Sequence, residues 1–141
     1  MIRSTSIIWF ERLSLLSLAL IVPQDYLAWD ELKAAAEADG VNPMVVVAVA
    51  QGIGIALSLF LILMVSRGRS RVFKWIYAVL SGLGLIWTFF TLPSELVGQP
   101  LAGALTAAQN LMVLVAIVLL FKSDSVRWLA GEDRVDPAIF S

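Results

Sequence analysis

Apolar residues are concentrated in four long runs along the 141-residue chain, separated by short polar segments. A bilayer core of about 30 Å is crossed by about 20 apolar residues in a helix, so each run is long enough to span a membrane. The pattern predicts an all-α, polytopic integral membrane protein that forms a single membrane domain over residues 1–141. The four expected transmembrane helices cover approximately residues 7–29, 43–65, 72–93 and 101–121, and a short cytoplasmic tail follows over residues 122–141.

The four spans differ in the strength of their signal. Residues 43–65 and 101–121 contain no charged residue, whereas the uninterrupted apolar part of the first span, Leu13–Val22, is short. That first span follows basic residues, which is also the general form of a cleaved signal peptide. Cleavage after Ala28 would need a small side chain two residues earlier, where Tyr26 stands. We therefore expect a retained helix.

Basic residues predict the orientation of the spans. Short loops rich in Lys and Arg stay on the cytoplasmic side of a membrane. Four spans place both termini on one side, together with the loop between the second and third spans. That side holds nine of the ten basic residues: Arg3, Arg12, Arg67, Arg69, Arg71, Lys74, Lys122, Arg127 and Arg134. Both termini are therefore expected to be cytoplasmic, and the two acidic loops are expected outside.

The spans are expected to form two helical hairpins. The segments Leu20–Leu27 and Phe90–Val97 each place Pro and then an acidic residue at the outer end of an odd-numbered span. This similarity suggests two hairpins of related design, although chance similarity between apolar segments is an alternative. The outer loop over residues 30–42 is expected to contain a short helix that ends at Gly40, because glycine readily adopts the left-handed conformation that closes a helix.

A further helix is expected after the fourth span. Ser123 or Ser125 is predicted to cap one or two helical turns, because serine side chains accept bonds from free amides at helix starts. Gly131 is predicted to end them. Within this segment Val126 and Leu129 are expected to face inward.

Composition excludes several kinds of site. Hydrophobic residues make up 60% of the chain, charged residues only 15%, and mean hydropathy is +0.88. A net charge of −1 gives no basic surface for nucleic acid. The chain has no Cys and no His, so thiolate zinc sites, histidine-ligated haem and Ser-His or Cys-His nucleophiles are excluded. We expect no cofactor, no metal site and no enzymatic activity.

Glu11 is the one carboxylate expected to reach into the bilayer from the inner face. An ionisable group inside a span is a functional hypothesis by default, because its burial is expensive. A proton-coupled exporter would need such a group, which makes Glu11 the transport candidate. An interfacial ion pair with the neighbouring Arg12 or with Arg67, Arg69 or Arg71 is the more economical interpretation.

Amides and glycines inside the spans are candidates for helix packing. An amide in hydrocarbon needs a hydrogen-bond partner, so Gln51 and Asn110 are each expected to bond to another helix. A ligand or quinone site built from the same groups is an alternative. Small residues at a spacing of four allow helix backbones to approach closely. The packing candidates are Gln51, Gly52, Gly54, Gly82, Gln109 and Asn110.

Three classes of function can be weighed from these features. Uncharged spans and the lack of catalytic residue types favour a non-catalytic accessory, assembly or scaffold subunit of a larger membrane complex, with other membrane proteins and lipid as partners. A small transporter or channel is the alternative, and it would have to be a homo-oligomer because four helices cannot enclose a path alone. A membrane enzyme is the least favoured class. Nucleic acid is not an expected partner.

Three segments also carry a resemblance to known proteins. Phe10–Leu18, Ser66–Trp75 and Leu119–Trp128 combine apolar helix ends with Ser, basic and aromatic residues, and Gly98–Leu101 precedes the fourth span. In these segments the chain resembles small four-span bacterial inner-membrane proteins of unknown function. The resemblance brackets most of the chain and implies the fold and a bacterial inner (plasma) membrane location. It lends no substrate and no catalytic residue.

Overall fold

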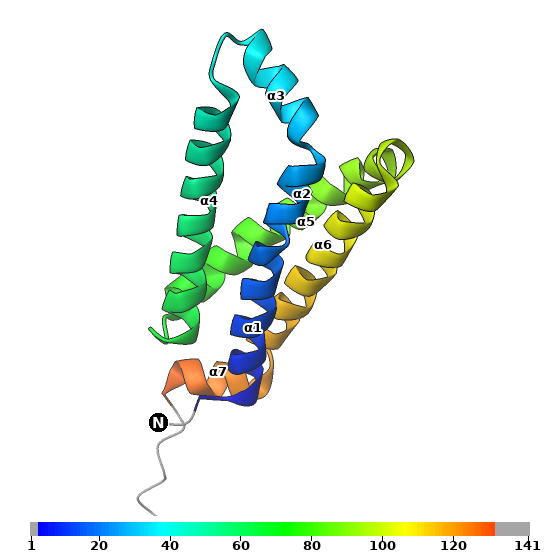
Figure 1. Ribbon diagram of the computed structural model, residues 1–141. Coiled ribbons are helices and arrows are strands. Elements are labelled where there is room, and N and C mark those ends of the chain that lie inside the picture. The colour runs from blue at the N-terminus through cyan, green and yellow to red at the C-terminus, as the bar shows by residue number, and fades with distance from the viewer. Residues whose placement is uncertain (1–2, 132–141) are drawn as a thin grey trace, which may run out of the picture.

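The computed structural model describes residues 3–131, and this part of the chain consists of helices and short turns (Figure 1). The helices are α1 (Thr5–Ala19), α2 (Ile21–Leu27), α3 (Trp29–Ala38), α4 (Pro43–Ser66), α5 (Arg71–Gly98), α6 (Pro100–Leu120) and α7 (Ser123–Ala130). Four helical segments are long and apolar enough to cross a membrane: Thr5–Leu27, α4, α5 and α6. The chain is therefore a multi-pass membrane protein by the length and composition of its helices.

The second and fourth spans lie where the sequence predicts them. Helix α4 has 24 residues and α6 has 21, which gives lengths of about 36 Å and about 32 Å at 1.5 Å per residue. Asn42 caps α4, because its side-chain oxygen accepts a hydrogen bond from the amide of Met44 at 3.0 Å. Pro43 and Pro100 stand in the first turns of α4 and α6, where a missing amide costs no helical bond.

The first and third spans differ from the prediction. A single helix was expected over residues 7–29, but it is interrupted at Leu20, between α1 and α2. Pro23 has no amide to donate to the carbonyl of Ala19, and its ring crowds that carbonyl. The third span was expected to end at Pro93, yet α5 contains this proline and continues to Gly98.

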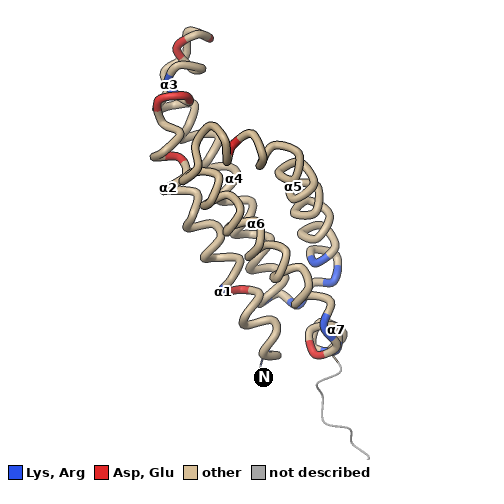
Figure 2. Tube along the Cα trace, turned by 90° about the vertical axis from the view of Figure 1, so that its right-hand side faces the viewer, with Lys and Arg blue, Asp and Glu red and all other residues tan. Residues whose placement is uncertain are grey.

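The four spans run alternately up and down, and their order around the bundle is α1, α4, α5, α6 (Figures 1 and 2). The first and last spans share the most extensive contact, followed by α5 with α6. Helices α5 and α6 meet closely at Gly103, where a Cβ atom would lie 2.9 Å from the Cα atom of Leu96. The second hairpin is therefore tighter than the first, whose helices α1 and α4 touch less extensively.

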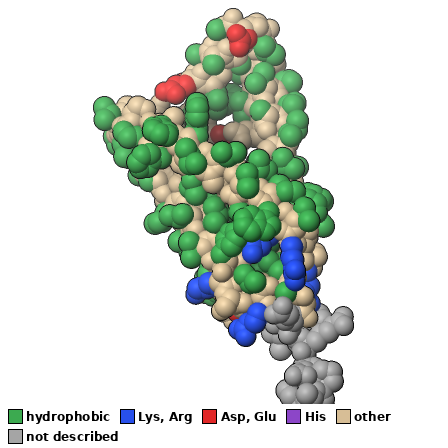
Figure 3. All heavy atoms as spheres, turned by 180° about the vertical axis from the view of Figure 1, so that it is seen from behind, with side chains coloured by type: hydrophobic (Ala, Val, Ile, Leu, Met, Phe, Trp, Pro, Cys, Tyr) green, Lys and Arg blue, Asp and Glu red, His purple; other side chains and the backbone are tan. Residues whose placement is uncertain are grey.

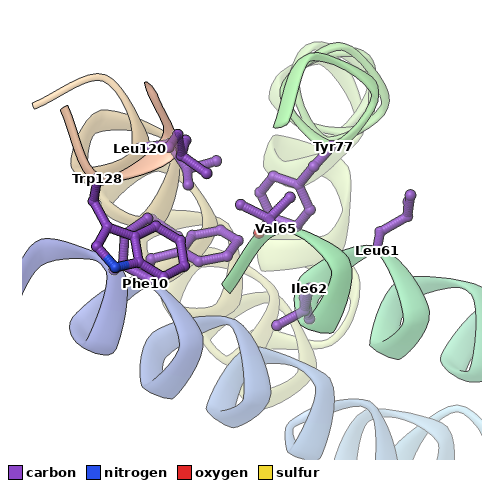
Figure 4. Close-up of a cluster of buried hydrophobic side chains, with 10 residues drawn as sticks. Phe10, Leu61, Ile62, Val65, Tyr77, Leu120 and Trp128 are labelled. Carbon is purple, nitrogen blue, oxygen red and sulfur yellow. The ribbon is translucent and has the colours of Figure 1, made fainter. Parts of the chain in front are cut away.

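The hydrophobic core lies at one end of the bundle. We call this the basic end, because Lys and Arg side chains gather there (Figure 3). Phe10, Ile62, Val65 and Leu120 are almost fully buried, together with neighbouring side chains from five helices (Figure 4). The ring of Tyr77 meets that of Phe10 edge to face at 5.0 Å. Every buried residue of α4 lies between Leu61 and Ser66, so neighbouring helices cover α4 only near its basic end.

Helix α7 packs beneath this core. Its inward residues are Ser125, Trp128 and Leu129, whereas Val126 is 42% exposed, so the prediction for Val126 was wrong. Successive residues of a helix are about 100° apart, so Val126 is turned away from the face that Ser125 and Trp128 centre on. The predicted serine cap was also wrong: Lys122 takes the cap position without a side-chain bond.

The hydroxyl group of Ser125 connects α7 to α6 and does not cap its own helix. Ser125 Oγ donates a hydrogen bond to the carbonyl of Leu119 at 2.7 Å and so joins α7 to the end of α6. Gly131 ends the helix in the left-handed conformation (φ 76°), as predicted.

The outer connection contains the predicted short helix. Helix α3 covers most of the expected segment and lies next to α4. Ala36 is buried, and the amide of Val41 donates to its carbonyl at 3.0 Å. Gly40 has a φ of 70°, so it supplies the left-handed turn that was predicted for it.

We predict that Asp124→Ala loosens α7. Ser6 donates to the Asp124 carboxylate from its hydroxyl at 2.8 Å and from its amide at 3.2 Å. Loss of both bonds should cost about 1 kcal/mol, because the carboxylate is only partly buried. An eight-residue helix has little stability of its own, so its amides should exchange hydrogen about fivefold faster. Ser123→Ala is the matched control, and equal protection of α7 in both variants would contradict the prediction.

The same contact should depend on pH. Burial raises the pKa of Asp124, but the hydrogen bonds from Ser6 lower it by more. The pKa therefore lies below its ordinary value of 3.8. A carboxylate with a lowered folded-state pKa stabilises the fold above its unfolded pKa. Protection of α7 should therefore hold at neutral pH and fall only as the pH drops below 3.8 through the folded-state pKa. Asp124→Ala should lack this acid-dependent step.

Candidate functional site

Polar side chains within the spans gather at two places, and the first lies at the basic end around Glu11. This residue is 7% exposed and projects from α1. One carboxylate oxygen accepts a hydrogen bond from Arg67 at 3.0 Å, and the other pairs with Arg3. Arg12, adjacent in the sequence, lies over the ring of Trp9 instead, at 5.6 Å from the ring centroid. The sequence thus named Arg67 among the possible partners and missed Arg3.

This geometry favours a structural use of Glu11. Two guanidinium groups compensate one carboxylate, so a partly buried charge is stabilised on both sides. The pairs also join α1 to the residue that follows α4. A carboxylate held in this way is poorly placed to take up and release protons during transport, since loss of its charge would leave two arginines facing each other.

The second gathering is a polar layer deeper in the bundle, formed by Gln24, Gln109, Asp25 and Gln51. Gln109 accepts a hydrogen bond from Gln24 Nε2 at 2.8 Å and donates one to the carbonyl of Ser17 at 2.9 Å. Gln109 lies nine residues after the start of α6, which is about 13 Å along the helix. At such a depth an amide must bond to protein, and Gln109 does so with both of its polar atoms.

Asp25 is the second carboxylate within the spans. Gln51 Nε2 donates to Asp25 Oδ1 at 2.9 Å, which joins α2 to α4. Gln51 lies eight residues into α4, so this pair is at about the same depth as Gln109. No Lys or Arg of the described chain forms an ion pair with Asp25. The Asp25–Gln51 pair is therefore less compensated than the Glu11 cluster.

A cavity of about 440 Å³ adjoins the polar layer. It lies between α2, α3, the last turns of α5 and the start of α6. Three carboxylates line it, from Asp25, Glu31 and Glu95, and Glu31 accepts a hydrogen bond from Gln99. We call this end of the molecule the acidic end, because Asp and Glu side chains prevail there (Figure 2).

The packing candidates have different surroundings. Gln51 and Gln109 bond to other helices, as their burial demands. Asn110 donates instead to the carbonyl of Thr106 in its own helix at 2.7 Å, so the expectation of a partner on another helix was wrong for this residue. An asparagine can bond to the carbonyl four residues earlier without any neighbouring helix.

The glycine candidates face open space within the chain. A Cβ atom added at Gly52, Gly54 or Gly82 would meet nothing within 4 Å. The close approach between helices is formed instead by Gly103 and Leu96. A role for Gly52, Gly54 and Gly82 in packing against another chain stays a prediction.

Sequence reasoning gave little weight to Asp25 and Gln24. They follow Pro23 near the outer end of the first apolar run, and neither was among the predicted candidate residues. The proline offers a signal in retrospect, because an interrupted helix can direct polar side chains toward neighbouring spans. The described residues contain no group of three His, Cys, Asp or Glu side chains able to hold a metal ion.

Comparisons with known proteins add no assignment. The chain matches no family model, no curated protein and no solved structure. Its function must therefore be argued from its own residues.

We predict that Gln109→Leu destabilises the bundle and that Asn110→Leu does not. The first variant removes two interhelical hydrogen bonds, each worth about 0.6–2 kcal/mol in a membrane protein, whereas the second removes a bond within α6. Thermal unfolding of the purified protein in detergent should show a lower midpoint for Gln109→Leu alone. Equal midpoints for the two adjacent substitutions would contradict the polar layer.

Proposed function

We propose that this chain is a non-catalytic accessory or scaffold subunit of a larger membrane assembly. The observation that carries the proposal is a small-residue face on α4 that none of the residues 3–131 covers. We define this face by Ala48, Gly52 and Ala56, which recur every four residues and are all exposed. Gly52 has open space where a side chain would be.

Membrane helices associate through close packing and hydrogen bonds, because apolar surface gains little by leaving lipid. A glycine in a helix lowers its stability relative to alanine, and that loss is offset where a neighbouring backbone approaches closely. Gly103 meets such a neighbour within the chain, whereas Gly52 does not. A transmembrane helix of a partner protein would supply the missing neighbour.

The arrangement of the helices leaves room for such a partner. Helices α4 and α5 meet at the basic end and diverge toward the acidic end (Figure 1). The buried residues of α5 are Lys74 and Tyr77, both in its first two turns. The outer halves of both helices are thus accessible from within the membrane.

We also propose that the protein resides in a bacterial inner membrane with both termini in the cytoplasm. Positive-inside loops support this orientation, since the basic end joins the start of α1, the turn between α4 and α5, and α7. The location in an inner membrane rests on the resemblance of the helix ends to small four-span bacterial proteins.

The proposal is tested by gentle detergent extraction at native expression level, followed by sizing and mass spectrometry of what co-purifies. Wild-type protein should be recovered in stoichiometric amount with other membrane proteins. Gly52→Leu should lose these partners at least tenfold while keeping its thermal midpoint, because the added side chain meets nothing within the chain. The matched control is Ile53→Leu on the same helix. Recovery of the wild type as a lone homo-oligomer would contradict the proposal.

A small homo-oligomeric transporter or channel is the second candidate. The observation that favours it is Asp25, an intramembrane carboxylate that lines the cavity at the acidic end. Intramembrane carboxylates commonly mark ion or substrate pathways. On this alternative, a second copy of the chain would complete the path.

Substitutions of Asp25 and Glu11 distinguish the accessory role from the transporter role. If the chain is an accessory subunit, Asp25→Asn should retain the co-purifying partners and a nearly unchanged phenotype. Glu11→Gln at normal protein level should do the same, although its thermal midpoint should fall because Arg3 and Arg67 lose their shared carboxylate. Liposomes with wild-type protein should show no proton or cation flux above protein-free liposomes. Flux that Asp25→Asn abolishes would establish the transporter class. Loss of function in Glu11→Gln at normal protein level would likewise favour transport.

A further inference from the structure

A second cavity, of about 260 Å³, lies at the basic end between the start of α5 and helix α7. Arg71, Lys74 and Trp75 line it from α5, and Val126, Leu129 and Ala130 line it from α7. Its charged lining residues are basic, and no Asp or Glu is among them. The cavity therefore combines two positive charges with an apolar wall.

Lys74 is the unusual member of this lining. It is only 7% exposed, yet its ammonium group forms no hydrogen bond or ion pair with any described residue. Its neighbours are rings: Nζ lies 4.2 Å from the centroid of Phe121 and 5.7 Å from that of Trp75. Aromatic faces attract a cation, but they leave the three N–H donors of an ammonium group without acceptors. A buried lysine of this kind calls for an anion.

Two further features favour an anion at this place. Arg71 and Lys74 line the same cavity, so their like charges repel and a bound anion would relieve that repulsion. The cavity also adjoins the start of α5, a helix of 28 residues whose N-terminus carries partial positive charge. By contrast, Arg3 and Arg67 at the same end already share Glu11.

We propose that this cavity binds the phosphate of an anionic phospholipid, with Arg71 and Lys74 as its ligands. The aromatic residues fit a lipid better than a free anion. Trp75 is 58% exposed beside the cavity, and indole rings favour the headgroup level of a membrane. From Trp75 an exposed apolar stripe of Val79, Leu83 and Ile86 follows α5 away from the basic end, where an acyl chain can lie.

Basic pockets between transmembrane helices bind anionic headgroups, and each Lys or Arg near an anionic surface contributes about a fivefold gain in affinity. The proposal goes beyond the proposed function and does not depend on a partner protein. It can therefore fail or hold whether or not the chain is an accessory subunit.

The test uses full-length protein, stripped of lipid in mild detergent, with phosphatidylglycerol and phosphatidylcholine offered in competition. Native mass spectrometry counts the lipid retained. Wild-type protein should prefer phosphatidylglycerol, and Arg71→Gln and Lys74→Gln should each lose about fivefold of that preference. Lys74→Arg should restore it. Arg71 is exposed, so its variant keeps the proposal testable if Lys74→Gln fails to fold.

Matched controls are Lys122→Gln and Arg127→Gln, which remove exposed charges from the same end but do not line the cavity. An equal loss of preference in these controls would overturn the site in favour of general surface charge. Displacement of phosphatidylglycerol by millimolar inorganic phosphate would overturn the lipid assignment in favour of a free anion. Unchanged preference in both Arg71→Gln and Lys74→Gln would overturn the proposal outright.

Discussion

Helices in lipid gain almost nothing by covering one apolar surface with another, and this constraint governs the whole molecule. Association depends on interlocking shapes and on polar groups that have no water to bond to. The structure supplies the first at the basic end, where Phe10, Ile62 and Leu120 fill the core. It supplies the second in the polar layer, where Gln109 and Gln51 connect three segments of the chain. A third close contact lies nearer the acidic end, where Gly103 of α6 meets Leu96 of α5.

The basic end of the bundle carries a surplus of positive charge, which its two carboxylates compensate only in part. Eight basic and two acidic residues of the described chain lie at the basic end, a surplus of six positive charges over Glu11 and Asp124: Arg3, Arg12, Arg67, Arg69, Arg71, Lys74, Lys122 and Arg127. Each of the two carboxylates connects two parts of the fold: Glu11 joins α1 to the turn after α4, and Asp124 joins α7 to α1. Repulsion among the remaining cations favours contact with anionic lipid over a sealed protein surface.

Composition and hydrophobic run length were sufficient to predict the spans, and the limits of α4 and α6 agree with the prediction almost to the residue. The break at Leu20 was missed although Pro23 was visible, because a proline interrupts one helix and is accommodated in another, as Pro93 is in α5. The candidate site was harder to predict. Which neighbour faces an amide depends on the register between helices, and the sequence of a single helix does not contain that register. Gln109 and Asn110 are adjacent, yet one bonds across the bundle and the other within its own helix.

The contrast between the carboxylates of Glu11 and Asp25 connects these arguments. Glu11 forms ion pairs with the guanidinium groups of Arg3 and Arg67 at the basic end, where the helices pack closely. Asp25 accepts a hydrogen bond from one amide, that of Gln51, and lines the cavity at the acidic end. A carboxylate with a single neutral partner in a low-dielectric region remains costly, so any group that approaches it with a positive charge or a hydrogen-bond donor gains affinity. The small-residue face of α4 allows a partner helix to come near, whereas Asp25 lines the cavity inside the chain. The half of α4 that lies beyond its buried residues is thus the place where a neighbouring membrane helix would be sterically admitted.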